Sequence, residues 1–200
     1  MNVNREQRVG IFIDIQNLYH SAKNLYNCRV NYKELVRHLV ADRKLIRAIA
    51  YVVKTETTEG ESAFFDALRE AGLELRVKDI QIYPGGMKKA DWDVGMAIDA
   101  VRLADSLDAV VLVTGDGDFI PLVEYLRWGL GRVVEVAGFS RTSSGKFRDA
   151  TDRFIPIEEI PRILLKSKKA PGRGRAASAR GGSEEGSFTS EDSGDAGEEE

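Results

Sequence analysis

The chain has 200 residues, of which 42% are hydrophobic and 30% charged, and its formal net charge is −3. This composition is typical of a globular protein with a sizeable core, and the single cysteine, Cys28, excludes an intrachain disulfide and a cysteine-rich zinc site. No apolar run approaches the roughly 18 residues of a membrane span, and residues 1–10 contain no apolar signal segment. We therefore expect a cytoplasmic protein with no membrane partner.

Short apolar runs alternate with segments of helical periodicity through the first 160 residues. The predicted strands span 9–15, 46–53, 73–83, 108–115, 132–138 and, more briefly, 154–157. The predicted helices between them span 32–42, 62–72, 91–106 and 118–129. The central strands are apolar on both faces, as buried parallel strands are. Strands that alternate with helices predict an α/β fold with a parallel sheet covered on both faces.

The composition changes near Lys166. Residues 166–182 carry six cations and no anion, whereas residues 183–200 carry eight anions and no cation. Neither half offers enough apolar surface to offset its ordering entropy, so we predict that residues 166–200 are disordered. Two roles stay open for this tail: a solubilising segment, or an arginine-glycine arm that contacts phosphates and is masked by the acidic end.

Acidic residues follow two of the predicted strands, at the sheet edge where open α/β sheets bind ligands. Asp14 ends the first strand, and Asp116 and Asp118 follow the fourth. Asp91 and Asp93 open the helix before the fourth strand, directly after Lys88 and Lys89 and Ala90. If the first and fourth strands are neighbours, these carboxylates converge. An all-oxygen set suits Mg²⁺ or Mn²⁺, which polarises a phosphoryl oxygen and lowers the pKa of a bound water.

Several of these acids also have a simpler interpretation. Asp91, Asp93 or Asp118, taken singly, is explained as a helix N-cap. Asp99 lies about 120° round the helix from Asp93, at ~100° per residue, and is explained as a surface ion pair with Arg102. Asp14 is harder to explain this way, because a carboxylate that ends an apolar strand needs a partner.

Three further features point to substrate contacts. Asn17, three residues after Asp14, has an amide that would orient a water or a phosphate. The segment GFSRTSSGKFR (138–148) follows the fifth strand, so Arg141, Ser143, Ser144 and Lys146 either bind phosphate or belong to an ordinary polar loop. Trp92, between two acids, is the best candidate to stack on an unpaired base.

Three motifs together resemble a known family. FIDIQNLY (12–19), KKADWDVGMAIDA (88–100) and VLVTGDGDFIPLV (111–123), followed by RVVEVAGFS and DATDRFIPI, resemble the NYN domain of the PIN-like nuclease superfamily, and within it the LabA-like group. The resemblance covers roughly residues 8–160. It implies a Rossmann-like three-layer α/β/α sandwich with strand order close to 3-2-1-4-5, a Mg²⁺ or Mn²⁺ site, and single-stranded RNA as substrate. The site residues that it implies are Asp14, Asn17, Asp93, Asp99, Asp116 and Asp118, with Asp91 as an additional acid.

The hypothesis from the sequence is a metal-dependent endoribonuclease. One or two ions would be held by Asp14, Asp93, Asp116, Asp118 and Asp99, and RNA would be contacted by Lys88, Lys89, Trp92, Arg141, Ser143 and Lys146. The alternative is a non-catalytic RNA-binding or regulatory protein on the same fold. A phosphatase ranks last, because the stretch Asp14-Ile15-Gln16 lacks the second acid of a D-x-D nucleophile motif. A homodimer remains open.

Overall fold

A computed structural model describes residues 4–54, 59–82, 88–89 and 91–166. Within this part of the chain, no helix is long and apolar enough to cross a membrane. The predicted tail lies outside the described residues, except for Lys166, which ends the last strand.

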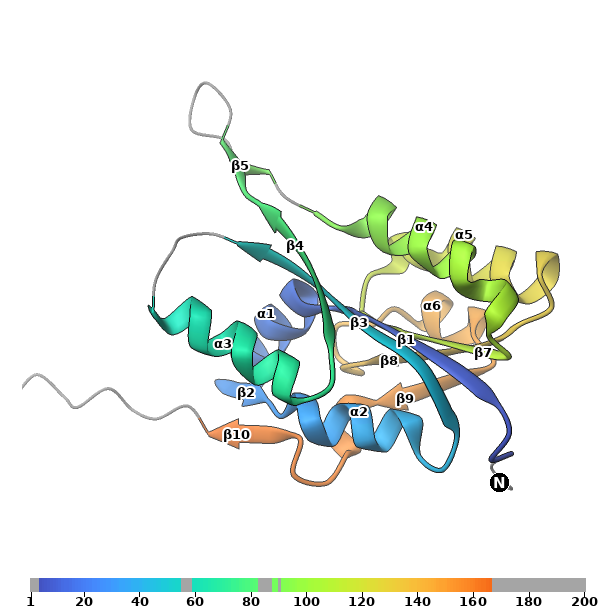
Figure 1. Ribbon diagram of the computed structural model, residues 1–200, viewed down its shortest axis with the longest axis horizontal. Helices are drawn as coiled ribbons and strands as arrows, with labels where there is room; N and C mark the ends of the chain where they lie inside the picture. The colour runs from blue at the N-terminus through green and yellow to red at the C-terminus, as the bar shows by residue number, and fades with distance from the viewer. Residues whose placement is uncertain (1–3, 55–58, 83–87, 90, 167–200) are drawn as a thin grey trace, which may run out of the picture. The chain divides into compact units, whose positions relative to one another are not determined.

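A six-stranded sheet forms the middle layer of the fold (Figure 1). Its strands, in spatial order, are β4 (Glu74–Asp79), β3 (Lys44–Lys54), β1 (Arg8–Asp14), β7 (Ala109–Val113), β8 (Val133–Gly138) and β9 (Arg153–Pro156). All five neighbouring pairs are parallel. This order is the predicted 3-2-1-4-5, with the short final strand added at the edge. Strand order reverses at β1, which pairs with β3 on one side and with β7 on the other.

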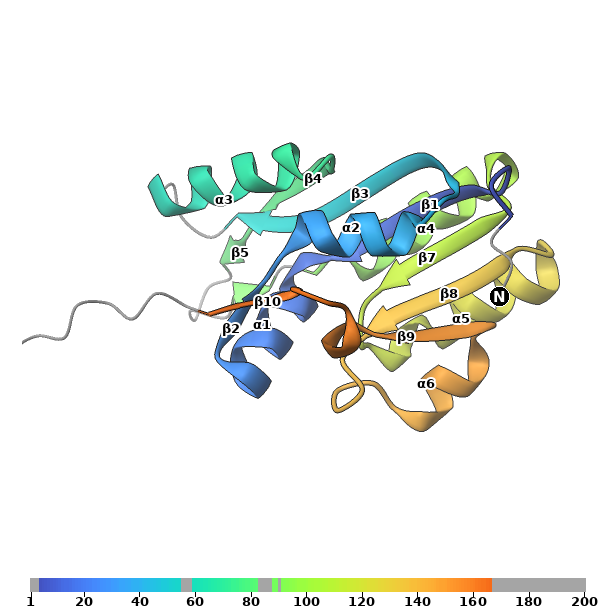
Figure 2. The ribbon, with the colours of Figure 1, turned by 90° about the horizontal axis from the view of Figure 1, so that it is seen from below.

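Helices cover both faces of the sheet, because its central strands are apolar on both faces. On β1, Val9, Ile11 and Ile13 belong to one core cluster, whereas Phe12 belongs to the other. The first cluster is covered by α1 (Ile15–Tyr26), α2 (Tyr32–Val40) and α3 (Glu59–Glu70). The second is covered by α4 (Asp93–Leu103), α5 (Ile120–Glu124) and α6 (Gly145–Ala150). Figure 2 shows α1 and α2 in front of the sheet and α4 behind it. The predicted three-layer α/β/α sandwich is confirmed.

Local signals account for several helix ends. Asn31 caps α2, and its side chain accepts a hydrogen bond from the backbone N–H of Glu34 at 3.3 Å. The carboxylate of Glu34 is bound by Arg37, so only half of a capping box forms. Gly72, just after α3, has a φ of 84°, a conformation that glycine adopts without strain.

The structure differs from the sequence-based prediction in several details, and two of its helices, α1 and α6, were not among the predicted ones. The predicted strand 73–83 is divided into β4 and a short β5 (Gln81–Ile82), which pairs antiparallel with β6 (Lys88–Lys89). A second antiparallel pair, between β2 (Cys28–Val30) and β10 (Leu164–Lys166), was not predicted, because three-residue strands carry too little periodicity. The predicted helix 118–129 is a 3₁₀ turn at Gly117–Phe119, then α5, then a π-helical turn at Tyr125–Gly129.

Candidate active site

Two of the predicted acids lie at the carboxyl-terminal edge of the sheet, where its strand order reverses. Asp14 is the last residue of β1, and Asp116 lies three residues after the end of β7. The two strands are paired in register, with Ile13 opposite Val113. Because parallel strands end at the same edge, both carboxylates lie at the edge of the sheet at which open α/β folds bind ligands.

A chain of hydrogen bonds joins the two strand ends. The carboxylate of Asp14 caps α1 and accepts a hydrogen bond from the backbone N–H of Asn17 at 3.0 Å. The side-chain oxygen of Asn17 in turn accepts a hydrogen bond from the backbone N–H of Gly115 at 2.9 Å. Asn17 therefore fixes the loop after β7 relative to the end of β1. The sequence motif identified Asn17 as a site residue but not this tie to Gly115.

Asp116 is held by its own loop. Its backbone N–H donates to the hydroxyl of buried Thr114 at 3.2 Å, and its carboxylate accepts from the backbone N–H of Asp118 at 2.9 Å. Asp116 thus caps the 3₁₀ turn, and Asp118 is exposed. The N-cap interpretation of Asp118 is wrong. It is also wrong for Asp91 and Asp93, because the N-cap of α4 is Trp92.

The carboxylates repel one another. Burial raises the pKa of Asp14 above its ordinary value, and the negative charges of Asp93 and Asp116 raise it further, against the lowering effect of the Asn17 N–H. Burial also raises the pKa of Asp93, followed by the charges of Asp91, Asp116 and Asp118. Asp93 therefore lies within electrostatic reach of Asp14, Asp91, Asp116 and Asp118, whereas the acids that act on Asp14 are Asp93 and Asp116.

The donor set matches a hard divalent cation in its chemistry, since it consists of partly buried carboxylate oxygens whose repulsion a cation offsets. In the described part of the chain, however, no three acidic, histidine or cysteine side chains are arranged to hold an ion together. The acids lie at the same edge of the sheet, but their carboxylates would have to move closer together to bind a single ion.

Tyr32, which the sequence analysis did not identify, lies within electrostatic reach of this group. It is buried at the start of α2, and burial followed by the charge of Asp14 raises the pKa of its hydroxyl. The phenol therefore stays protonated at neutral pH. Its only sequence signal is its position directly after the helix cap Asn31.

Asp99 is not brought into this group. Its carboxylate accepts a hydrogen bond from the hydroxyl of Tyr51 at 3.1 Å and forms an ion pair with Arg76 at 3.5 Å. It is not among the charges that shift the pKa of Asp14 or of Asp93. The structure thus favours the ion-pair interpretation of Asp99, although its partner is Arg76 on β4 instead of Arg102.

Trp92 packs within the protein. Its indole N–H donates to the backbone carbonyl of Val52 at 2.9 Å, and its ring lies 5.5 Å from that of Tyr51. The ring also lies over Gly95, where an added Cβ would approach it to 2.6 Å. Trp92 therefore anchors the start of α4 and positions Asp93. The sequence analysis predicted instead that Trp92 stacks on unpaired bases. The sequence signal for this packing is Gly95, three residues after Trp92, because a side chain there would collide with the Trp92 ring.

The loop after β8 packs against the Asp116 loop. A Cβ added to Gly115 would lie 3.2 Å from the Thr142 hydroxyl and 3.3 Å from the Ser143 hydroxyl. Ser143 is buried and its hydroxyl has no hydrogen-bond partner among the described residues, so the predicted contact of Ser143 with phosphate is not available in this arrangement. Arg141 and Lys146 are exposed beside it, and the hydroxyl of Ser144 caps α6. Lys88 and Lys89 form β6, and their side chains lie outside the described part of the structure.

The fold and these acids define a class of α/β protein with a carboxylate-lined edge at the reversal point of a parallel sheet. The NYN domain family model matches residues 8–158, and the chain belongs to this family. NYN domains are a nuclease-type family and generally bind RNA.

Two relatives support this assignment. The chain is 26% identical over 174 residues to the low amplitude and bright protein LabA of Synechococcus elongatus, covering 82% of this chain and 91% of LabA. A crystal structure of a protein of unknown function from Vibrio parahaemolyticus superposes with a TM-score of 0.75 at 30% identity, covering 82% of this chain and all of that chain. The protein is therefore similar to LabA over most of its length.

Proposed function

We propose that this protein is a divalent-metal-dependent endoribonuclease that hydrolyses phosphodiester bonds in single-stranded RNA. The observation that carries the proposal is the gathering of carboxylates from β1, α4 and the loop after β7 at one edge of the sheet. Buried carboxylates that repel one another destabilise the folded state, so their presence together is best explained by a bound cation.

In this proposal, Asp14, Asp93 and Asp116 hold Mg²⁺ or Mn²⁺, with Asp118 beside them. A divalent cation bound there would lower the pKa of the attacking water and would neutralise negative charge on the phosphoryl oxygens. Asn17 keeps the two strand ends together, and Trp92 fixes the helix that carries Asp93.

The RNA backbone needs cations at the rim of this edge. Exposed Arg141 and Lys146 contact phosphates beside the Asp116 loop, and Lys88 and Lys89 guide the strand near Asp93. Residues 8–160 constitute the nuclease domain, and the arginines of the tail add affinity that depends on salt concentration. We assign this activity to the reducing cytoplasm, as expected for a chain with one cysteine.

The test uses end-labelled single-stranded RNA with the purified full chain in Mn²⁺, in Mg²⁺ and in EDTA. Wild type is compared with Asp116→Asn and with Asp105→Asn, a control at a carboxylate whose side chain is 93% exposed. Cleavage that requires metal, disappears in Asp116→Asn and persists in Asp105→Asn supports the proposal. Cleavage that survives in Asp116→Asn refutes the site and indicates a contaminating ribonuclease.

A second candidate function is RNA binding without cleavage. The observation that favours it is that no three potential ligands among the described residues are arranged around an ion. Thermal unfolding separates the two candidates, since a metal that binds the folded state raises the midpoint in proportion to ln(1 + [L]/Kd). RNA binding that EDTA does not change, with no shift of the midpoint at millimolar Mn²⁺, favours the non-catalytic function.

A further inference from the structure

A pocket lies at the other end of the sheet from the acids. Its cavity volume is about 530 Å³, within the range of small-molecule sites. It opens beside Val133 and Arg153, the first residues of β8 and β9, and beside the carboxyl-terminal end of α2. Because all strands of the sheet are parallel, this amino-terminal edge is separate from the edge that carries Asp14 and Asp116.

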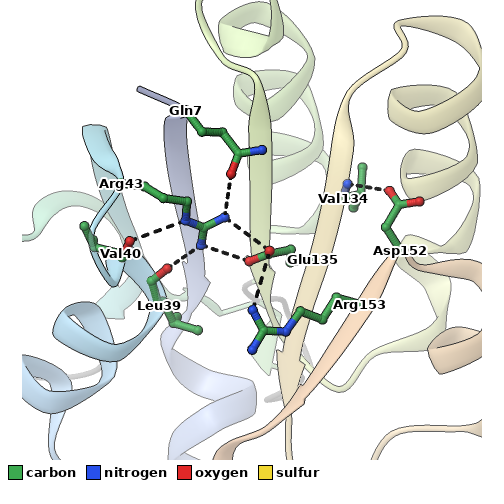
Figure 3. A network of polar contacts seen from close by, with 8 residues as sticks. All are labelled: Gln7, Leu39, Val40, Arg43, Val134, Glu135, Asp152 and Arg153. Carbon is green, nitrogen blue, oxygen red and sulfur yellow. Dashed lines mark hydrogen bonds and ion pairs between the residues drawn. The ribbon is translucent and has the colours of Figure 1, made fainter. Parts of the chain in front are cut away.

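The pocket is cationic. Its described lining contains three arginines and one histidine but a single carboxylate, Glu135. Figure 3 shows how that carboxylate is neutralised: both of its oxygens accept hydrogen bonds from Arg43, at 3.1 and 3.0 Å. The side chains of this pair are only 6% and 8% exposed. The Arg43 guanidinium also donates to Gln7 and to the backbone carbonyls of Leu39 and Val40, so it is fixed in place.

Two other arginines keep donors for a ligand. The guanidinium of Arg153 lies 3.9 Å from Glu135 and forms no hydrogen bond with the described residues, and about half of its side chain is exposed. Arg37 binds Glu34 through Nε and Nη2, and its Nη1 donates to no described residue. Arg37, His38 and Arg153 line the pocket together with Glu135, which Arg43 already balances; Arg37 is itself paired with Glu34, which lies 2.6 Å away and outside the described lining.

The rest of the lining includes apolar side chains. Leu39 and Ile155 are buried behind the pocket, and Val133, which also lines it, keeps 39% of its surface exposed. An exposed valine at the start of a central strand leaves apolar surface for a ligand to cover. The pocket therefore combines an apolar wall with unsaturated guanidinium donors, which suits a ligand with a flat apolar body and a phosphate group.

We propose that this pocket binds a free nucleoside monophosphate, with the phosphate on Arg153 and Arg37 and the base against Val133. A phosphate monoester carries between one and two negative charges at pH 7 and has three acceptor oxygens, which match the planar donor fork of arginine. The proposal does not rest on nuclease activity, because no residue of the carboxylate edge lines the pocket.

Isothermal titration calorimetry of the full chain tests this site. The probes are the four common nucleoside monophosphates, adenosine, inorganic phosphate and a 5′-phosphorylated hexanucleotide. We expect at least one monophosphate to bind at least tenfold more tightly than adenosine or inorganic phosphate, since only the monophosphate uses both the arginines and the apolar wall. Arg153→Glu should weaken that binding at least tenfold, and Val133→Phe should weaken it by filling the pocket without removing a charge.

The matched control is Arg102→Glu, an identical charge change at an exposed position on α4, which covers the opposite face of the sheet. Binding by Arg102→Glu within twofold of wild type, with losses in Arg153→Glu and Val133→Phe, supports the proposal. Equal binding of inorganic phosphate, or unchanged binding in Arg153→Glu, overturns it. Binding of the hexanucleotide without any free monophosphate also overturns it, because the occupant would then be an RNA end. Circular dichroism and thermal unfolding establish that each variant is folded before its affinity is compared.

Discussion

Removing one partner of the Arg43–Glu135 ion pair should destabilise the protein far more than removing both. The pair sits at the inner wall of the pocket, and more than nine-tenths of each side chain is buried (Figure 3). Arg43→Met leaves the Glu135 carboxylate buried, with only Arg153 at 3.9 Å to compensate it. Glu135→Leu leaves the Arg43 guanidinium buried without its two charged hydrogen bonds.

The structure sets the size of each effect. An uncompensated buried charge costs about 3–5 kcal/mol, so each single variant should lose that much free energy of unfolding. The double variant Arg43→Met/Glu135→Leu buries no charge. It loses mainly the donors to the carbonyls of Leu39 and Val40, at about 1 kcal/mol each, and should be destabilised by about 2 kcal/mol. The coupling energy between the two positions should therefore be at least about 4 kcal/mol.

Urea unfolding of the wild type, both single variants and the double variant measures this cycle. The control is Arg69→Met, which breaks the exposed Arg69–Asp66 pair on α3 and should cost less than about 1 kcal/mol. If the two single costs simply add in the double variant, or if Glu135→Leu costs no more than Arg69→Met, the assignment of a buried, mutually dependent pair is refuted.

Three further predictions concern the candidate active site. Asp116→Asn removes a negative charge that acts on Asp14 and Asp93, so in EDTA it should raise the free energy of unfolding by about 1 kcal/mol, while thermal unfolding should show less stabilisation by Mn²⁺ than in wild type. The pKa of Asp14 is raised above its ordinary 3.8 in the folded protein, so protonation of Asp14 stabilises the fold. This stabilisation is fully present below pH 3.8 and is lost as the pH rises through the higher pKa of the folded state. In urea unfolding from pH 4 to 7, Asp14→Asn should lose less stability than wild type, and an equal loss would contradict the raised pKa. Gly138→Ala places a Cβ 2.9 Å from a backbone carbonyl and should cost about 1–3 kcal/mol, whereas Gly145→Ala meets no atom within 4 Å and should be neutral or slightly stabilising; equal effects in urea unfolding would refute the crowding.

The sheet and its acidic edge could be predicted from sequence because both depend on local patterns. Central strands such as β7 are apolar at every position, which identifies them as buried on both faces. Asp14 ends one such strand and Asp116 lies three residues after another, and parallel strands bring their carboxyl ends together. The predicted strand order followed from the family resemblance and is confirmed.

Contacts between distant residues could not be predicted in the same way. The bond from the Gly115 N–H to Asn17 joins positions 98 residues apart, and nothing in either motif indicates it. The six-residue spacing of Asp93 and Asp99 indicated that they lie on different sides of α4, but it did not indicate that Tyr51 and Arg76 bind Asp99 there. The ion pair of Arg43 with Glu135 joins positions 92 residues apart, and a glutamate within an apolar strand was its only signal.

The position of β1 in the sheet has a consequence for synthesis of the chain. Among the strands of the six-stranded sheet, β1 is synthesised first; its partner β3 ends at Lys54, but its other partner, β7, ends only at Val113. Until then one side of β1 has no strand to pair with, and an unpaired apolar edge favours association with other chains. Asp116 emerges later still, so the nascent amino-terminal half carries Asp14 without one of the acids whose charge acts on it in the folded protein. The carboxylate edge is therefore assembled only when the second half of the chain docks onto the first.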